Sequence, residues 1–234
     1  MGASLTFGMV AGVYLTLSLY LATYFWEFSN QQLAGMVLPT ALGTVLAFSG
    51  MGWLGLRYDK PALLTAAAIA LAVNAFWMIG ARLLGLLPEN GHPLIYPLAM
   101  ISTCITTVIL VGLQTLSVSL IADILDEQEL ATGRRQEGTF FAAGTFILKA
   151  TTGVGTLIAG VVIDLAGIEP GSAPGSVPQP VLQSLGWFTL AVVCGLCLVA
   201  CWFYSRIRLG RKEHSRIMLQ LEQSRAAGGA FTAQ

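Results

Sequence analysis

The sequence has few of the residues on which most soluble enzymes depend. Only 10% of its 234 residues are Asp, Glu, Lys or Arg, and their charges cancel, so no basic surface is available for nucleic acid. Its two histidines lie outside the apolar segments and no G-x-S-x-G motif occurs, which argues against a hydrolase. All four cysteines fall within apolar segments, which favours neither a disulfide framework nor a metal site. We therefore expect no enzymatic activity, no cofactor and no bound metal.

Long apolar runs dominate what is present. Apolar residues make up 55% of the chain, and the mean hydropathy is +0.73, as in integral membrane proteins. Helices of about 20 residues cross a ~30 Å hydrocarbon core, and the sequence offers such segments at residues 3–26, 33–56, 61–83, 93–121, 139–163 and 181–204. The sequence predicts an all-α, polytopic membrane protein with a six-helix transmembrane domain at 1–207 and a tail at 208–234.

The cations fall almost entirely on one side of these predicted spans. Apart from Lys149, only Arg82, at the end of the third segment, lies on the side of the loops that follow the first, third and fifth segments. All other Lys and Arg residues lie in the turn at 57–60, in the charged loop predicted at 123–137 and after residue 204. Because short cation-rich loops stay in the cytoplasm, we expect both termini to be cytoplasmic and the chain to lie in the cell (inner) membrane.

Lys149 is the ionisable residue that lies deep within a predicted span. It follows Gly138 by eleven residues, or about 16 Å along a helix, which is close to the middle of a bilayer. Thr145, Thr152 and Thr156 recur around it at helical spacing and share its face. A cation at this depth must face protein or water. The pattern predicts a polar cavity between helices.

Other polar residues within the spans permit two readings. Asn74 and Trp77 are spaced i, i+3 on the third segment, and one face of the fourth carries Thr103, Thr107, Gln114 and Ser117. Such residues often form hydrogen bonds between membrane helices, and for the threonines we favour this structural role. A solute-lining role is the alternative. Asp164, near the opposite end of the fifth segment from its charged start, is read as a solvated helix end.

The residues ADILDEQELATGRRQEGTFFAAGTFILK at 122–149 resemble the signature around the tenth and eleventh helices of the glycoside-pentoside-hexuronide:cation symporters, the group that includes melibiose/sodium symporters, in the major facilitator superfamily. The residues YLATYFWEFSN at 20–30 are similar to that family's seventh helix. The resemblance covers essentially the whole chain and matches the second half of the family fold. It implies a C-terminal six-helix half of a symporter that works by alternating access.

Several residues acquire expected roles from this resemblance. It implies that charged residues close the cytoplasmic side by pairing with the other half: Asp123, Asp126, Arg135 and Glu137. It places Lys149 beside the sugar and cation sites and matches Thr145 to a position in the sugar pocket. Together with these, we expect Gln114, Asn74, Trp77 and Thr152 to line the solute side. Gly144 and Gln114 stand where sugar carriers of the family can have glutamine and tryptophan, so the substrate is expected to differ from a galactoside.

The resemblance also implies partners. The family's carboxylates for the coupling cation, Na⁺ or H⁺, lie on the N-terminal half, which this sequence does not contain. We expect the chain to act in the lipid bilayer with an N-terminal six-helix half or a second copy of itself, and to move a sugar or glycoside. The alternative is a non-transporting six-helix fragment that oligomerises with, or regulates, a full-length homologue. Lys149→Ala would abolish solute binding in the first case and have no effect in the second.

Overall fold

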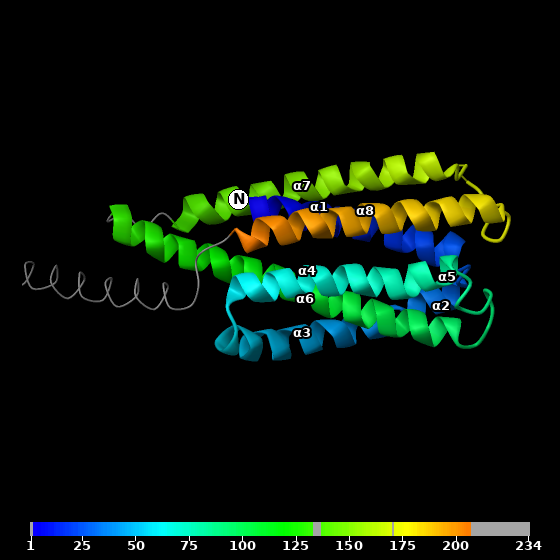
Figure 1. Cartoon of the computed structure of the whole chain (residues 1–234), viewed down its shortest axis with the longest axis horizontal. Helices are drawn as coiled ribbons and strands as arrows, with labels where there is room; N and C mark the ends of the chain where they lie inside the picture. Colours follow the sequence, from blue (N-terminus) through cyan, green and yellow to red (C-terminus); the bar gives the residue numbers. More distant parts are fainter. Residues whose placement is uncertain (1, 133–136, 170, 207–234) are drawn as a thin grey trace, which may run out of the picture.

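The computed structural model describes residues 2–132, 137–169 and 171–206, and these residues form helices and connecting turns without a strand. In chain order (Figure 1) the elements are α1 Gly2–Tyr20, η1 Leu21–Phe25, α2 Asn30–Gly35, α3 Val37–Arg57, α4 Lys60–Ala75, η2 Phe76–Gly80, α5 Ala81–Leu83, α6 Ile95–Thr132, α7 Glu137–Ala166 and α8 Gln179–Ser205. The segments η1 and η2 are single π-helical turns that continue α1 and α4. The all-α prediction is confirmed.

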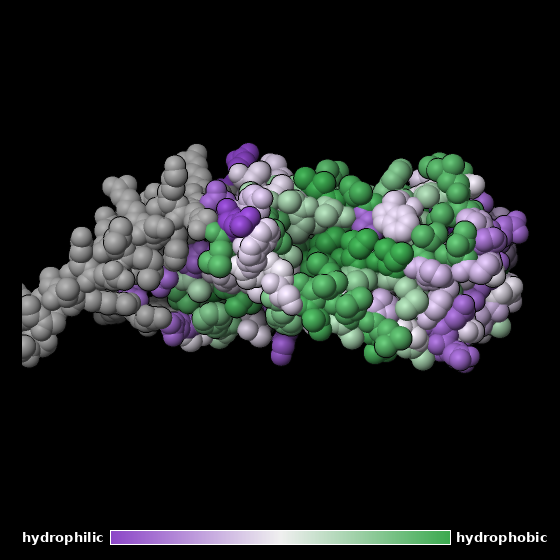
Figure 2. Space-filling model, turned by 90° about the horizontal axis from the view of Figure 1, so that it is seen from below, coloured by the Kyte–Doolittle hydropathy of each residue, from purple (hydrophilic) through white to green (hydrophobic). Residues whose placement is uncertain are grey.

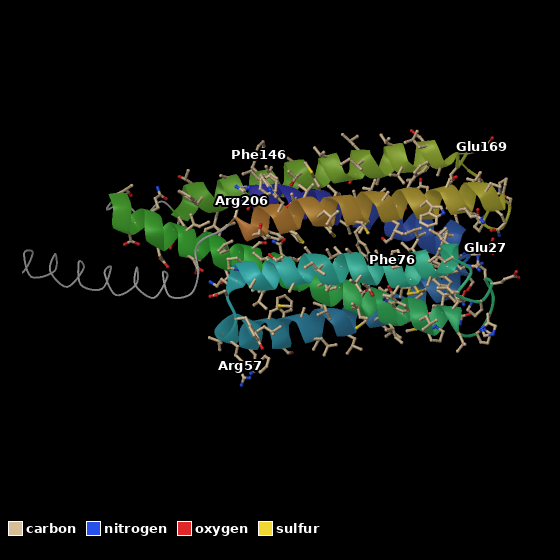
Figure 3. The ribbon with its side chains drawn as sticks, viewed as in Figure 1. Glu27, Arg57, Phe76, Phe146, Glu169 and Arg206 are labelled. Atoms are coloured by element: carbon tan, nitrogen blue, oxygen red, sulfur yellow. The ribbon has the colours of Figure 1, made fainter. Side chains whose placement is uncertain are left out.

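Six of these helical stretches are long and apolar enough to span a membrane, as predicted. They run side by side along the long axis, and the beginning of α1 lies at the same end as the end of α8 (Figure 1). On the face seen in Figure 2, an apolar band crosses the middle of the molecule, with polar residues towards both ends. Glu27 and Glu169 lie at one end, whereas Arg57 and Arg206 lie towards the other (Figure 3).

The helices pack as three close pairs, α1 with α7, α3 with α6, and α4 with α8. Glycines allow the first pair to touch backbone to backbone: a Cβ on Gly12 would lie 3.0 Å from the Gly155 Cα and would clash with the Thr152 carbonyl. In the second pair, a Cβ on Gly43 would lie 2.7 Å from the Cys104 carbonyl oxygen. Small residues at such contacts are the usual means by which membrane helices pack closely.

The predicted charged loop at 123–137 is wrong in its extent. Helix α6 continues through Asp123 as far as Thr132, and α7 begins at Glu137. The sequence from Asp123 to Thr132 contains Leu, Glu, Gln and Ala but no glycine or proline, so nothing in it opposes a helix. Helix α6 is therefore 38 residues long, or about 57 Å, and extends well beyond a ~30 Å core. The tail at 208–234 lies outside the described residues.

Candidate functional site

A cavity of about 430 Å³ lies within the six-helix unit. Its lining comes from α1, η1, α2, the start of α3, α4, η2, α6 and α8. Leu15 and Leu19 belong to its lining and are 66% and 60% exposed, so the cavity opens at the surface of the unit. The volume falls in the range of small-molecule sites.

Asn74 organises one polar wall of this cavity. It is 4% exposed, and its amide nitrogen donates to the Thr106 hydroxyl at 2.7 Å, the Ser102 hydroxyl at 3.2 Å and the Ser102 carbonyl at 3.1 Å. The Trp77 indole donates to the Asn74 side-chain oxygen at 2.7 Å. The predicted pair of Asn74 and Trp77 is thus brought together. This network fastens α4 to α6, and Asn74 itself lines the cavity.

The cavity lining also includes hydroxyl side chains that were not among the predicted residues: Tyr14, Ser18, Thr40, Ser102, Thr106 and Thr189. The Tyr14 hydroxyl reaches the Thr106 side chain, which links α1 to the Asn74 network. Thr106 directly precedes Thr107, which belonged to the predicted face. The hydroxyl-rich run in α6 therefore indicated this part of the cavity wall, although not Thr106 itself. Thr189 is an isolated threonine in an apolar helix, and no sequence pattern marks it.

Lys149 lies on the exposed face of α7, outside the cavity lining. Thr145 and Thr156 are also exposed, and Thr152 is half-buried and donates to the Leu148 carbonyl of its own helix at 2.8 Å. Within the described part of the chain, no hydrogen bond or ion pair involves the Lys149 ammonium group. The stripe on α7 therefore faces away from the other five spans. No second polar helix of this unit covers it.

Gln114 is half-buried on α6 and is not among the residues around the cavity. It follows Thr107 by seven residues, or about 10 Å along the helix, towards the end of the unit that carries Arg57 and Arg206. Of the predicted face on α6, Thr103 and Thr107 line the cavity, while Gln114 and Ser117 do not. Of the predicted solute residues, Asn74 lines the cavity, Lys149 and Thr145 lie on the exposed face of α7, and Trp77, Thr152 and Gln114 are half-buried and outside the cavity lining.

The charged residues expected at a cytoplasmic gate lie in different surroundings. Asp123 is 8% exposed and accepts two hydrogen bonds from the Lys60 ammonium group, at 2.7 and 2.6 Å. Lys60 also donates to the Ser119 carbonyl at 3.4 Å. This ion pair joins the start of α4 to α6 within the same six-helix unit. Asp126 is half-buried on α6, Glu137 begins α7 and is exposed, and Arg135 lies outside the described residues.

The described residues do not gather His, Cys, Asp or Glu side chains in groups of three that could hold a metal ion. The cavity offers instead uncharged donors and acceptors together with apolar and aromatic surface. Such a lining can hold a small uncharged molecule by hydrogen bonds and packing. It contains no arrangement of a nucleophile and a base of the kind used in covalent catalysis.

Comparison with known proteins adds two findings. Residues 1–211 match the protein family described as MFS/sugar transport protein. The chain is also similar to a protein of Synechocystis sp. that is named as an uncharacterized symporter, with 26% identity over 211 residues. The similar region covers 80% of this chain and 37% of that relative, so the chain spans well under half of the relative's length.

Proposed function

This chain belongs to the MFS/sugar transport protein family, and from that membership we propose that it is one six-helix unit of a membrane carrier for a sugar or glycoside. The carrier works by alternating access, in which two six-helix units rock about a solute held between them. The second unit is an N-terminal six-helix half or a second copy of this chain. The name of the Synechocystis relative supports symport, so we include coupling to Na⁺ or H⁺ in the proposal.

The observation that carries this proposal is the position of Lys149. Its ammonium group lies on the exposed face of a spanning helix and has no partner among the described residues. It follows the first residue of α7 by twelve residues, or about 18 Å. A cation held this deep in lipid is unfavourable by ~2.5–3.5 kcal/mol on insertion scales. A second helical unit across an aqueous crevice would remove this penalty and would convert the α7 stripe into the wall of a solute path.

The cavity supports the same proposal. Its opening beside Leu15 and Leu19 gives a solute access to Asn74 and the α6 hydroxyls without entering lipid, provided that a second unit covers the opening. The proposed solute-lining residues are Lys149, Thr145, Thr152, Asn74, Trp77 and Gln114. The ion pair with Lys60 favours a role for Asp123 in holding α4 against α6 within the unit. We still propose Asp126, Arg135 and Glu137 as residues of the cytoplasmic gate.

A binding experiment tests this function. The chain is purified alone and with a co-expressed N-terminal six-helix unit of a family member, and the binding of a panel of neutral sugars is measured by calorimetry. We expect saturable binding only in the two-unit assembly. Lys149→Ala should abolish it, whereas Lys149→Arg, which keeps the positive charge, should retain part of it. Equal binding by the lone chain, or an Ala variant that binds like the wild type, contradicts the proposal.

A further inference from the structure

Thr189 carries a buried hydroxyl that nothing in the described structure satisfies. Its side chain is 2% exposed and lines the cavity, and no hydrogen-bond partner for its Oγ1 atom exists among the described residues. Other threonines of the spans, including Thr107 and Thr151, donate to the carbonyl four residues earlier in their own helix. Thr189 does not. Buried polar groups without a partner are rare and call for a specific explanation, such as a bound molecule.

The rest of the lining limits what that molecule is. Among the described residues around the cavity there is no Asp, Glu, Lys, Arg or His. The polar groups are all neutral: Tyr14, Ser18, Thr40, Asn74, Ser102, Thr103, Thr106, Thr107 and Thr189. Trp26 and Phe28 add aromatic faces, which pack against flat apolar surface. A carboxylate placed among these groups would lose its hydration without gaining a cationic partner inside the cavity, because Lys149 lies outside the cavity lining.

We propose that this cavity binds the transported solute through Thr189 and selects an uncharged, hydroxyl-bearing ring over the corresponding acid. The proposal rests on the proposed transport function. The cavity volume of about 430 Å³ suits a small solute. Because Thr189 belongs to α8 and Asn74 to α4, solute selection depends on two helices that do not carry the Lys149 stripe. The α8 hydroxyl meets a solute hydroxyl, while the Asn74 network holds the wall formed by α4 and α6 in place.

The test uses the two-unit assembly and matched sugar pairs that differ in one carboxylate, glucose with glucuronate and galactose with galacturonate. The neutral member that binds should do so at least about tenfold more tightly than its acid. Thr189→Val has nearly the shape of threonine but lacks the hydroxyl, and it should weaken binding of the neutral sugar by about fivefold, the effect of one hydrogen bond. Thr189→Ser keeps the hydroxyl and should bind like the wild type.

Thr151→Val is the matched control, because Thr151 is 5% exposed, lies outside the cavity and donates only to carbonyls of its own helix. It should leave affinity unchanged. A second readout separates binding from folding: without sugar, Thr189→Val should unfold at a higher temperature than the wild type, because an unpartnered buried hydroxyl is removed. If Thr189 had only a structural role, its substitution would not be expected to raise the unfolding temperature and at the same time weaken sugar binding.

Two results contradict the inference alone. One is wild-type affinity in Thr189→Val, which would mean that only water meets the hydroxyl. The other is tighter binding of the acid than of the neutral sugar. Failure of the wild-type assembly to bind any sugar contradicts the proposed transport function itself, and this inference with it. The three results are distinguishable because wild-type binding is measured first.

Discussion

The contact between α1 and α7 can be tested with two alanine substitutions two residues apart. Gly155 is buried, and a Cβ there would lie 3.0 Å from the Gly12 Cα and would clash with the Met9 carbonyl. Gly153 lies on the same helix, and a Cβ there would meet nothing within 4 Å. Gly155→Ala should therefore force the two helices apart, which is unfavourable by about 1–3 kcal/mol for overpacking. Gly153→Ala should stabilise α7 by up to about 1 kcal/mol.

The two variants should thus differ by about 1–4 kcal/mol in the free energy of unfolding. At about 2–4 °C per kcal/mol for a chain of this length, that corresponds to roughly 2–16 °C between their unfolding midpoints. Thermal unfolding in detergent, followed by tryptophan fluorescence, measures the difference directly. Size-exclusion profiles show whether the separated helices also expose surface that aggregates. Equal midpoints for Gly155→Ala and Gly153→Ala would refute the backbone-to-backbone packing of α1 and α7.

Two further substitutions test the internal polar contacts by the same thermal assay. Lys60→Met removes the ammonium group that donates two hydrogen bonds to the buried Asp123 carboxylate, and it should destabilise the unit by about 1–3 kcal/mol. Lys60→Arg keeps the charge and should stay near wild type. Equal effects of the two substitutions would contradict an ion pair that depends on charge. Asn74→Leu removes hydrogen bonds to α6 and to Trp77, which at ~0.6 kcal/mol each in a membrane protein amounts to about 2 kcal/mol. A more stable Asn74→Leu variant would show that the network does not hold α4 on α6.

The parts of the fold that follow from local sequence were predictable. Apolar runs predicted the six spans, because each helix must satisfy its own backbone in lipid. The spacing of Thr145, Lys149, Thr152 and Thr156 predicted a shared face, and the structure places this face on the outside of the unit. The family resemblance was supported at the level of the sugar-transport family. The specific symporter group remains a prediction.

The parts that depend on contacts between distant segments were not predictable. Lys60 and Asp123 are 63 residues apart and meet only because α4 packs on α6. The roles of Gly12 and Gly155 require knowledge of which helices are neighbours. Thr189 has no polar companion at helical spacing, so only the packing of α8 shows that it lines a cavity. The full length of α6 is not evident from the sequence because a charged run such as 123–132 is typical both of a loop and of an exposed helix. Its Glu, Gln, Leu and Ala residues form helices readily.

The most direct test of the account is whether water reaches Lys149. With Lys60→Arg and Lys212→Arg, Lys149 is the only lysine left in the chain. The two-unit assembly, in membranes, is treated with membrane-impermeant and permeant amine reagents, and modification of position 149 is measured by mass spectrometry with and without a bound neutral sugar. We predict that a reagent modifies Lys149 in the folded assembly and that the sugar protects it. If neither reagent ever reaches that nitrogen, the aqueous crevice does not exist and the carrier proposal is contradicted.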